Sequence, residues 1–243
     1  MDSFAPGLLV AAALIAAVAG VIRGITGFGG AMVMTPPFAL MFGPWLAVPI
    51  GLILESLVAL PMVFQTRHLV RWRLIGPMCL AAVLAVPLGV QVLVSVDPLL
   101  LRRAIAGTVI VFSLLLFVGW RHAGAPRIGT SVGLGAVSGA MIGSVGMGAP
   151  PVILYLLSGP DPIERTRANV NLYLVIGSLA AIAVLLGHGV LDPEALWLCL
   201  LLTPGYYAGL VLGVRLFSHF GDTKFRQFVL VLLIAVSTGI LLA

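Results

Sequence analysis

Arg23 is the strongest candidate for a functional residue, because it carries a permanent charge inside one of the most apolar regions of the chain. Its guanidinium offers a planar fork of donors that suits sulfonate, phosphate or carboxylate groups. Glycines, which let a ligand approach the backbone closely, crowd the positions that follow: Gly24, Gly27, Gly29 and Gly30. The pattern indicates an anion site. The alternative is that Arg23 ends its helix at the cytoplasmic surface and extends its charge into water.

Glu55 is the second candidate, since it is the only acid between residues 24 and 66. A carboxylate within a membrane is a functional hypothesis by default. Glu55 could carry a coupling proton, because burial disfavours the charged form of an acid. It could instead hold Arg23 in a structural ion pair, or lie near the exterior interface, and the residues alone leave these alternatives open.

Membrane helices must position these two side chains. Hydrophobic residues make up 61% of the chain and charged residues 9%, with a mean hydropathy of +1.20, far outside the range of soluble proteins. We expect an all-α polytopic membrane protein with eight to ten hydrophobic segments. Its net charge of +5 then belongs to loops that orient the chain rather than to a nucleic-acid surface. Four uncharged runs are long enough to cross a membrane: residues 3–22, 74–96, 168–191 and 195–214. Two more runs, 104–120 and 227–243, are a little shorter and are also plausible spans.

An internal repeat divides the chain into two halves. GVIRGITGFGGAMV, starting at Gly20, aligns without gaps on GAMIGSVGMGAPPV, starting at Gly139, at an offset of 119 residues. PLGVQVL, starting at Pro87, aligns on VLGVRLF, starting at Val211, at an offset of 124. We expect one membrane domain, 1–243, built from repeat one, 1–123, and repeat two, 124–243.

Loop charge predicts that the two repeats are inverted. RHLVRWR (67–73) is the densest basic cluster and is therefore expected on the cytoplasmic side. Its counterpart, HGVLDPE (188–194), has no Lys or Arg and is expected on the exterior. The loops 120–127, 161–167 and 222–226 agree with this orientation, whereas Arg102 and Arg103 fall on the exterior side and count against it.

The glycine clusters predict broken or re-entrant helices. A helix that begins near Gly30 would direct unsatisfied N–H groups and partial positive charge at the first glycine loop. In the second copy, Pro150 or Pro151 suits a first helical turn and marks a helix start just after Gly148. Discontinuous helices at corresponding positions of inverted halves indicate a transporter's binding site, and two helix N-termini favour an anion.

The small residues before Arg23 predict which way it faces. Ala12, Ala16, Ala19 and Gly20 share its helix face, and their repeat counterparts are Ser131, Gly135, Ser138 and Gly139. A repeated small-residue stripe is typical of a close-packed helix interface. Arg23 should therefore face protein or a cavity rather than lipid, and its counterpart Ile142 means that only one half contributes the charge.

The predicted site draws on both halves. On the second half, Asn169 and Tyr173 share one helix face and could contact the substrate or form interhelical hydrogen bonds instead. Glu55 is the predicted coupling residue. The predicted substrate-binding residues are Arg23, Gly24, Thr26, Gly27, Gly29, Gly30, Gly143, Ser144, Gly146, Gly148, Pro150, Asn169 and Tyr173.

Enzyme motifs are weak in this sequence. Ser144 lies in GSVG but has no histidine partner in the apolar spans. Metal-ligand spacing, a P-loop and a dinucleotide-binding fingerprint do not occur in the sequence. We expect neither an enzyme nor a cofactor-dependent protein.

The paired motifs GITGFGGAMVMTP and GSVGMGAPPVILY, together with the chain length, resemble the TauE/SafE sulfite exporter family over nearly the whole chain. The family's glycine motifs correspond to Gly24, Gly27, Gly29 and Gly30 in the first half. In the second half they correspond to Gly143, Gly146, Gly148, Pro150 and Pro151. The resemblance implies a multi-pass permease of the inner membrane for sulfite, sulfoacetate or another sulfonate.

These observations lead to the hypothesis of a secondary transporter for a small sulfur-containing anion that works by alternating access, with Glu55 as a candidate for proton coupling. The alternative is an uncoupled anion channel or an accessory membrane subunit. The expected partners are the anionic substrate and the lipid bilayer, with no nucleic acid. The sequence leaves open whether the protein forms a homodimer.

Overall fold

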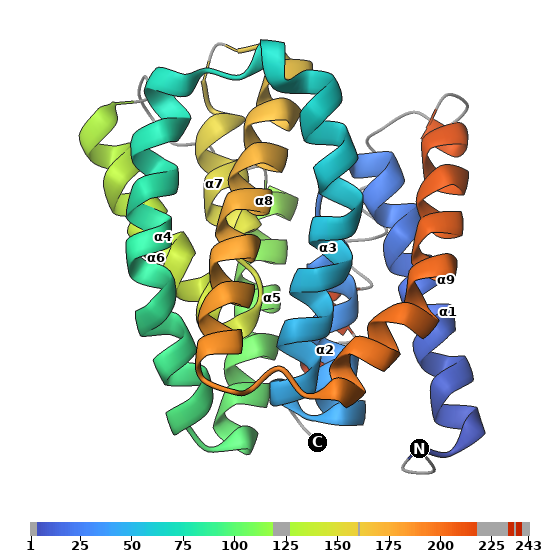
Figure 1. Ribbon diagram of the computed structural model, residues 1–243. Helices are drawn as coiled ribbons and strands as arrows, with labels where there is room; N and C mark the ends of the chain where they lie inside the picture. Colours follow the sequence, from blue (N-terminus) through green and yellow to red (C-terminus); the bar gives the residue numbers. More distant parts are fainter. Residues whose placement is uncertain (1–3, 119–126, 160, 218–232, 236, 240–243) are drawn as a thin grey trace.

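All regular secondary structure that the computed structural model describes is helical (Figure 1). The structure describes residues 4–118, 127–159, 161–217, 233–235 and 237–239. The elements are α1 (Pro6–Thr26), α2 (Gly30–Phe42), α3 (Pro44–Thr66), the 3-10 turn η1 (Arg67–Leu69), α4 (Trp72–Ser95), α5 (Pro98–Val118), α6 (Ile128–Val145), α7 (Ala149–Leu156), α8 (Ile163–Gly187) and α9 (Pro193–Phe217).

Seven helices of the described residues are long and apolar enough to cross a membrane. These are α1, α3, α4, α5, α6, α8 and α9, whereas α2 and α7, with 13 and 8 residues, are shorter. The chain is therefore a multi-pass membrane protein. The expected span 227–243 falls largely outside the described residues, as do most of the loop 120–127 and all of the loop 222–226.

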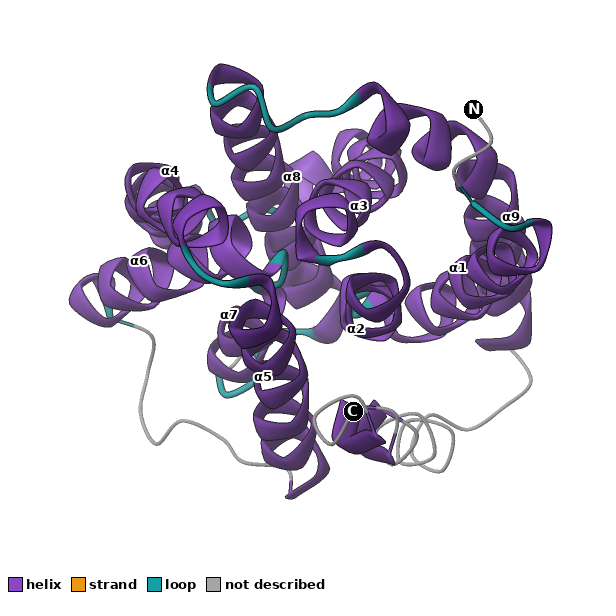
Figure 2. Ribbon diagram, turned by 90° about the horizontal axis from the view of Figure 1, so that it is seen from below, coloured by secondary structure: helices purple, strands orange, loops and turns teal. Residues whose placement is uncertain are grey.

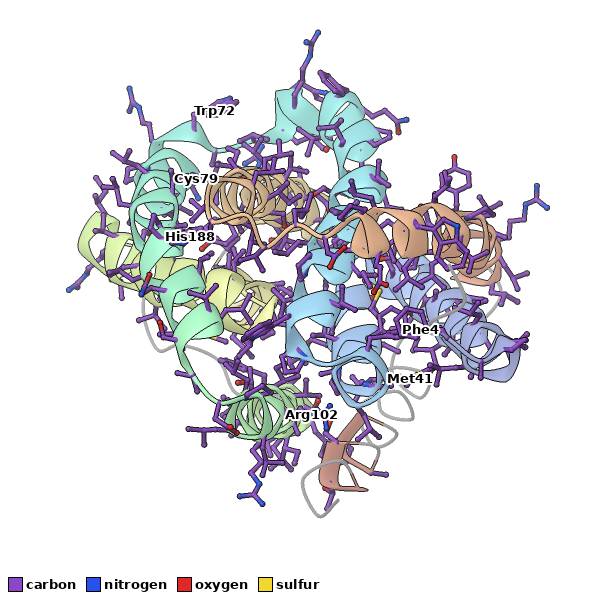
Figure 3. The ribbon with its side chains drawn as sticks, turned by 60° about the horizontal axis from the view of Figure 1, so that its bottom comes forward. Phe4, Met41, Trp72, Cys79, Arg102 and His188 are labelled. Carbon is purple, nitrogen blue, oxygen red and sulfur yellow. The ribbon has the colours of Figure 1, made fainter. Side chains whose placement is uncertain are left out.

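The connections at residues 67–71 and 188–192 lie at opposite ends of the molecule (Figure 1). The first joins α3 to α4 at the upper end of the view, and the second joins α8 to α9 at the lower end. Figure 3 likewise shows Trp72, at the start of α4, far from Arg102 in the first turns of α5. The basic connection and its predicted counterpart therefore occupy opposite faces.

Helix α1 packs directly against the backbone of α9. A Cβ atom added at Gly20 would lie less than 3.0 Å from the carbonyl oxygen of Tyr206, and one at Gly24 would meet that of Leu210 equally closely. Such contacts require residues without side chains. The close-packed interface predicted for the face of α1 that carries Gly20 is confirmed.

Helix α6 packs against α4 in the same manner. A Cβ atom added at Gly139 would lie less than 3.0 Å from the carbonyl oxygen of Ala82, and one at Gly143 would approach that of Val86 just as closely. Seen along the helices (Figure 2), the α1 and α9 pair lies on one side of the molecule and the α4 and α6 pair on the other. Helices α2, α3, α7 and α8 lie between the two pairs.

Both glycine-rich segments end one helix and begin the next, as expected. After α1, Gly27 adopts a left-handed φ of 81° and its N–H donates to the carbonyl of Arg23 at 2.8 Å; α2 then begins at Gly30. After α6, Gly146 has a φ of 72° and donates to the carbonyl of Ile142 at 3.1 Å; α7 then begins at Ala149. A left-handed residue after a helix is a common C-cap that glycine adopts without strain.

Candidate functional site

Arg23 lies on α1 one turn before the first glycine loop and is 1% exposed. The expectation that it faces protein or a cavity is confirmed, and the alternative of a charge extended to the surface is wrong. The physical reason is that the small-residue face of α1 carries Arg23 into the interior together with Gly20. A buried guanidinium requires partners, because an unpaired charge is very costly away from water.

Glu55 on α3 is the ionic partner of Arg23. The Nη1 atom of Arg23 lies 2.8 Å from Oε2 of Glu55, and the two side chains are 0% and 7% exposed. The ion pair that the sequence left as one alternative for Glu55 is thus formed. Removing one member of such a pair leaves the other charge uncompensated in a low-dielectric interior.

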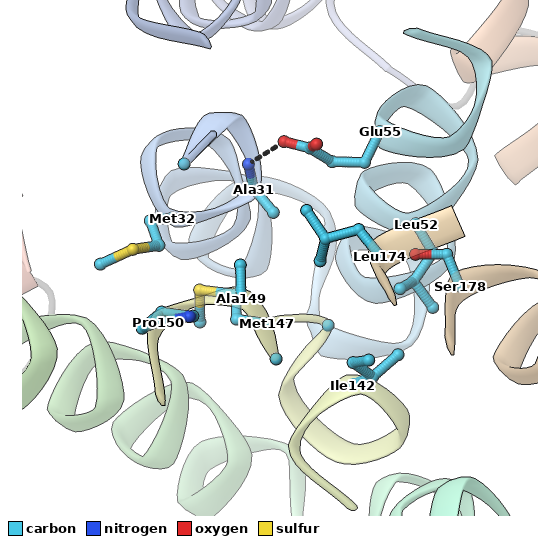
Figure 4. A pocket seen from close by; sticks show the side chains of 13 residues that line it. Ala31, Met32, Leu52, Glu55, Ile142, Met147, Ala149, Pro150, Leu174 and Ser178 are labelled. Atoms are coloured by element: carbon cyan, nitrogen blue, oxygen red, sulfur yellow. Dashed lines mark hydrogen bonds between the residues drawn. The ribbon is translucent and has the colours of Figure 1, made fainter. Parts of the chain in front are cut away.

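The other oxygen of Glu55 accepts two hydrogen bonds. The backbone N–H of Ala31 donates to Oε1 at 2.7 Å, and the hydroxyl of Tyr206 on α9 donates to it at 3.1 Å. Figure 4 shows the bond between Ala31 and Glu55. Because Ala31 is the second residue of α2, the carboxylate lies at the positive end of that helix dipole.

Gly30 makes this arrangement sterically feasible. A Cβ atom at this position would lie 2.5 Å from Oε1 of Glu55 and would also overlap the hydroxyl of Tyr206. Any other residue would therefore displace the carboxylate or the tyrosine. The glycine that opens α2 thus allows an acidic group to approach the helix N-terminus.

Asn171 on α8 completes the surroundings of Arg23. The Nη2 atom of Arg23 donates to Oδ1 of Asn171 at 3.0 Å, and Asn171 is 2% exposed. Sequence reasoning missed Asn171 and Tyr206. Asn171 stands two positions after Asn169, so a helix directs the two amides to different faces, and only the packing of α8 decides which one meets Arg23.

The two glycine motifs line one small cavity (Figure 4). Its volume is about 20 Å³, which is room for a single water molecule. The N-terminal residues of α2 and of α7 both reach it, so the two helix starts face the same space as Glu55. The lining residues are Gly29, Ala31, Met32, Leu52, Glu55, Ile142, Gly146, Met147, Gly148, Ala149, Pro150, Leu174 and Ser178.

Several predicted site residues make backbone contacts away from this cavity. The amide oxygen of Asn169 accepts from the N–H of Arg71 at 2.9 Å, and the hydroxyl of Tyr173 donates to the carbonyl of Gly135 at 3.3 Å. The contact of Tyr173 is an interhelical hydrogen bond, as in the named alternative, whereas that of Asn169 joins α8 to the residue before α4. Ser144 donates to the carbonyl of Ala140 at 2.8 Å, one turn earlier in its helix.

The remaining predicted residues lie around the first glycine loop or in helix interfaces. Thr26 donates to the carbonyl of Ile22 at 2.8 Å. Gly24 and Gly143 belong to the interfaces with α9 and α4. The aliphatic part of Arg167, a residue that the sequence reasoning did not include in the site, packs over Gly27, where a Cβ atom would lie 3.1 Å from its Cδ.

Two short helices that begin at corresponding glycine motifs beside a buried charge pair are a feature of many secondary transporters. The sequence profile of the sulfite exporter TauE/SafE family matches residues 12–240, and the chain belongs to this family. It is therefore a membrane transporter and not an enzyme. No curated protein and no solved structure matches the chain.

Proposed function

We propose that this protein moves a small sulfur-containing oxyanion, such as sulfite or an organosulfonate, across the inner membrane by alternating access. The observation that carries the proposal is a buried arginine paired with Glu55, which lines the cavity where the helices after the two glycine motifs start. Arg23 supplies fixed positive charge, and the start of α2 supplies N–H groups and dipole charge. The start of α7 supplies mainly dipole charge, because Pro150 and Pro151 in its first turn have no N–H groups. Together they suit an oxyanion better than a cation or a neutral solute.

The proposed binding residues divide by their distance from the cavity. Gly29, Gly146, Gly148 and Pro150 lie at or just before the starts of the two short helices and line the cavity. Gly30 begins α2 and lies against Glu55. Arg23 approaches it through Glu55. Gly24, Thr26, Gly27, Gly143, Ser144, Asn169 and Tyr173 form the surrounding layer that holds these backbones in place.

The repeat itself is supported by equivalent contacts, and the inverted relation that alternating access uses is supported by the opposite ends at which residues 67–71 and 188–192 lie (Figure 1). In the sequence, α6 follows α1 at an offset of 119 residues, and α9 follows α4 at an offset of 124. The same offsets convert contacts between α1 and α9 into contacts between α6 and α4. Three close contacts of α1 with α9 thus have counterparts between α6 and α4. The contact of Gly20 with Tyr206 matches that of Gly139 with Ala82. The contact of Gly24 with Leu210 matches that of Gly143 with Val86, and the contact of Gly213 with Val21 matches that of Gly89 with Ala140.

The two halves differ in polarity at the centre. In the first half, Arg23 reaches across to Glu55 on α3. In the second half, its counterpart Ile142 reaches Gly177 on α8, where a Cβ atom would lie 2.5 Å from Cδ1 of Ile142. One half therefore supplies the charge and the other an apolar wall, so a single anion site, rather than two, forms at the junction.

The cavity is smaller than the proposed substrate. A volume of about 20 Å³ admits a water molecule but not an oxyanion with several heavy atoms. In the proposed cycle, the walls supplied by the two motifs separate before the anion enters. Opening toward one side and then the other is the motion that exchange of conformation between inverted halves produces.

Ligand-dependent thermal stability of the purified protein tests this proposal. We expect one of sulfite, thiosulfate, sulfoacetate, taurine or toluene sulfonate to raise the unfolding midpoint more than sulfate, phosphate or acetate. A ligand at about 100 times its Kd adds about 2.7 kcal/mol of stability by mass action. Arg23→Met should remove this shift, whereas Arg103→Met, at an exposed position of α5, should keep it. An equal shift in both variants would refute the role of Arg23.

A further inference from the structure

The carboxylate of Glu55 already occupies the position that an anion would take. Its two oxygens lie 2.8 Å from Nη1 of Arg23 and 2.7 Å from the N–H of Ala31, and Tyr206 donates to the latter oxygen. A guanidinium, a helix N-terminus and a hydroxyl form a donor set that binds oxyanions in general. We propose that Glu55 is an internal substitute for the transported anion, an inference that rests on the proposed function. The anion binds at these donors only after Glu55 accepts a proton and moves away from them.

Space excludes simultaneous occupancy. The cavity beside Glu55 holds about 20 Å³, so an oxyanion cannot lie next to the carboxylate while the carboxylate keeps its contacts. Charge excludes it as well, because two anions beside one guanidinium in a dry interior repel strongly. Protonation removes both the charge of Glu55 and its attraction to Arg23 and to the start of α2.

The donor set has capacity that Glu55 does not use. Within the described part of the chain, Nε of Arg23 is buried without a hydrogen-bond partner, and Nη1 has only its ionic contact with Glu55. A guanidinium carries five N–H donors, and a bidentate oxyanion can engage two of them in parallel. A tetrahedral or pyramidal sulfur oxyanion, with three oxygens, can reach Arg23, Ala31 and Tyr206 together.

The charged and titratable groups that face Glu55 are few. Arg23 on α1 and Tyr206 on α9 contact it directly. Helices α2 and α6 carry no charged or titratable side chain. On α8, Arg167 packs over Gly27 in the adjoining loop. In the described part of the chain, the ionic and hydrogen-bond partners of the carboxylate are Arg23, Ala31 and Tyr206. None of these three is an acid, so we assign the proton to Glu55.

One proton and one anion consequently share a single route. A proton passes from water to a carboxylate oxygen of Glu55, the anion takes the vacated donors, and on the other side the anion leaves before the proton returns to water. Glu55 then re-forms its contacts with Arg23 and Ala31. The two species move in the same direction, and for a singly charged sulfonate the transported pair carries no net charge.

The test is the pH dependence of methanesulfonate binding, measured by isothermal titration calorimetry on detergent-solubilised protein. Methanesulfonate stays ionised from about pH 5 to about pH 8, so the titration belongs to the protein. Wild-type affinity should fall as pH rises, approaching about tenfold per pH unit. Glu55→Gln should bind with pH-independent affinity, and Glu164→Gln, which alters an exposed acid of α8, should behave as wild type.

A second measurement needs no variant. Methanesulfonate binding to the wild-type protein at about pH 8 in weak buffer should take up close to one proton per bound anion. Binding without proton uptake, or an identical pH profile in Glu55→Gln and wild type, would overturn the internal-substitute proposal. Absence of binding by methanesulfonate, sulfite and toluene sulfonate in the folded wild type would instead overturn the proposed function on which it rests.

Discussion

Replacing Arg23 by methionine should lower stability by about 3 to 5 kcal/mol and reduce substrate exchange at least about a hundredfold. The stability loss follows because the Glu55 carboxylate, whose side chain is 7% exposed, stays buried with only Ala31 and Tyr206 as donors. The exchange loss follows because the anion loses the guanidinium that we propose binds it. Denaturant titration in micelles and exchange in proteoliposomes measure the two effects.

The double variant Arg23→Met with Glu55→Gln separates structure from function. Removing both charges leaves neither uncompensated, so its stability should lie well above that expected from adding the two single losses. Exchange should stay abolished in the double variant, because the anion still lacks Arg23. Full exchange by a stable double variant would show that Arg23 serves only to neutralise Glu55.

Gly139→Ala should be among the most damaging single methyl additions outside the site. The new Cβ atom would overlap the backbone of Ala82, because it would lie less than 3.0 Å from the carbonyl oxygen of that residue. Because that neighbour is backbone, relief requires α6 and α4 to separate along their interface. We expect a loss of about 1 to 3 kcal/mol from overpacking, measured as a lower denaturation midpoint.

Two further variants calibrate the effect of Gly139→Ala. Gly20→Ala makes the equivalent change between α1 and α9 and should cost a similar amount, since the contacts correspond through the repeat. Gly133→Ala changes a residue of α6 whose added Cβ atom would have nothing within 4 Å. It should be neutral or stabilising by up to about 1 kcal/mol, because alanine favours a helix. Equal effects of Gly139→Ala and Gly133→Ala would contradict the close interface.

The local features of this fold could be predicted because they depend on nearby residues. Gly27 and Gly146 mark helix ends, and Pro150 marks a helix start, through their own backbone preferences. The face shared by Gly20 and Arg23 follows from helical periodicity. These signals sufficed to predict the two breaks, the close-packed α1 interface and the burial of Arg23.

The partners within the site could not be predicted because they come from distant helices. Tyr206 and Asn171 lie 151 and 148 positions from their partners Glu55 and Arg23. Which face of α9 or α8 meets the site depends on how these helices pack, not on their own composition. The contact of Glu55 with Ala31 was missed for a different reason: it places an acid where the sequence suggested only a substrate anion.

Counterflow in proteoliposomes tests the central claim most directly. Vesicles preloaded with unlabelled sulfite and diluted into trace radiolabelled sulfite should accumulate label transiently above equilibrium with the wild-type protein, and Arg23→Met should accumulate none. Methanesulfonate in the vesicles should replace sulfite in driving the uptake if the site accepts sulfonates. Flux that rises in proportion to concentration without counterflow, or full counterflow by Arg23→Met, would contradict a carrier whose anion site is built on Arg23.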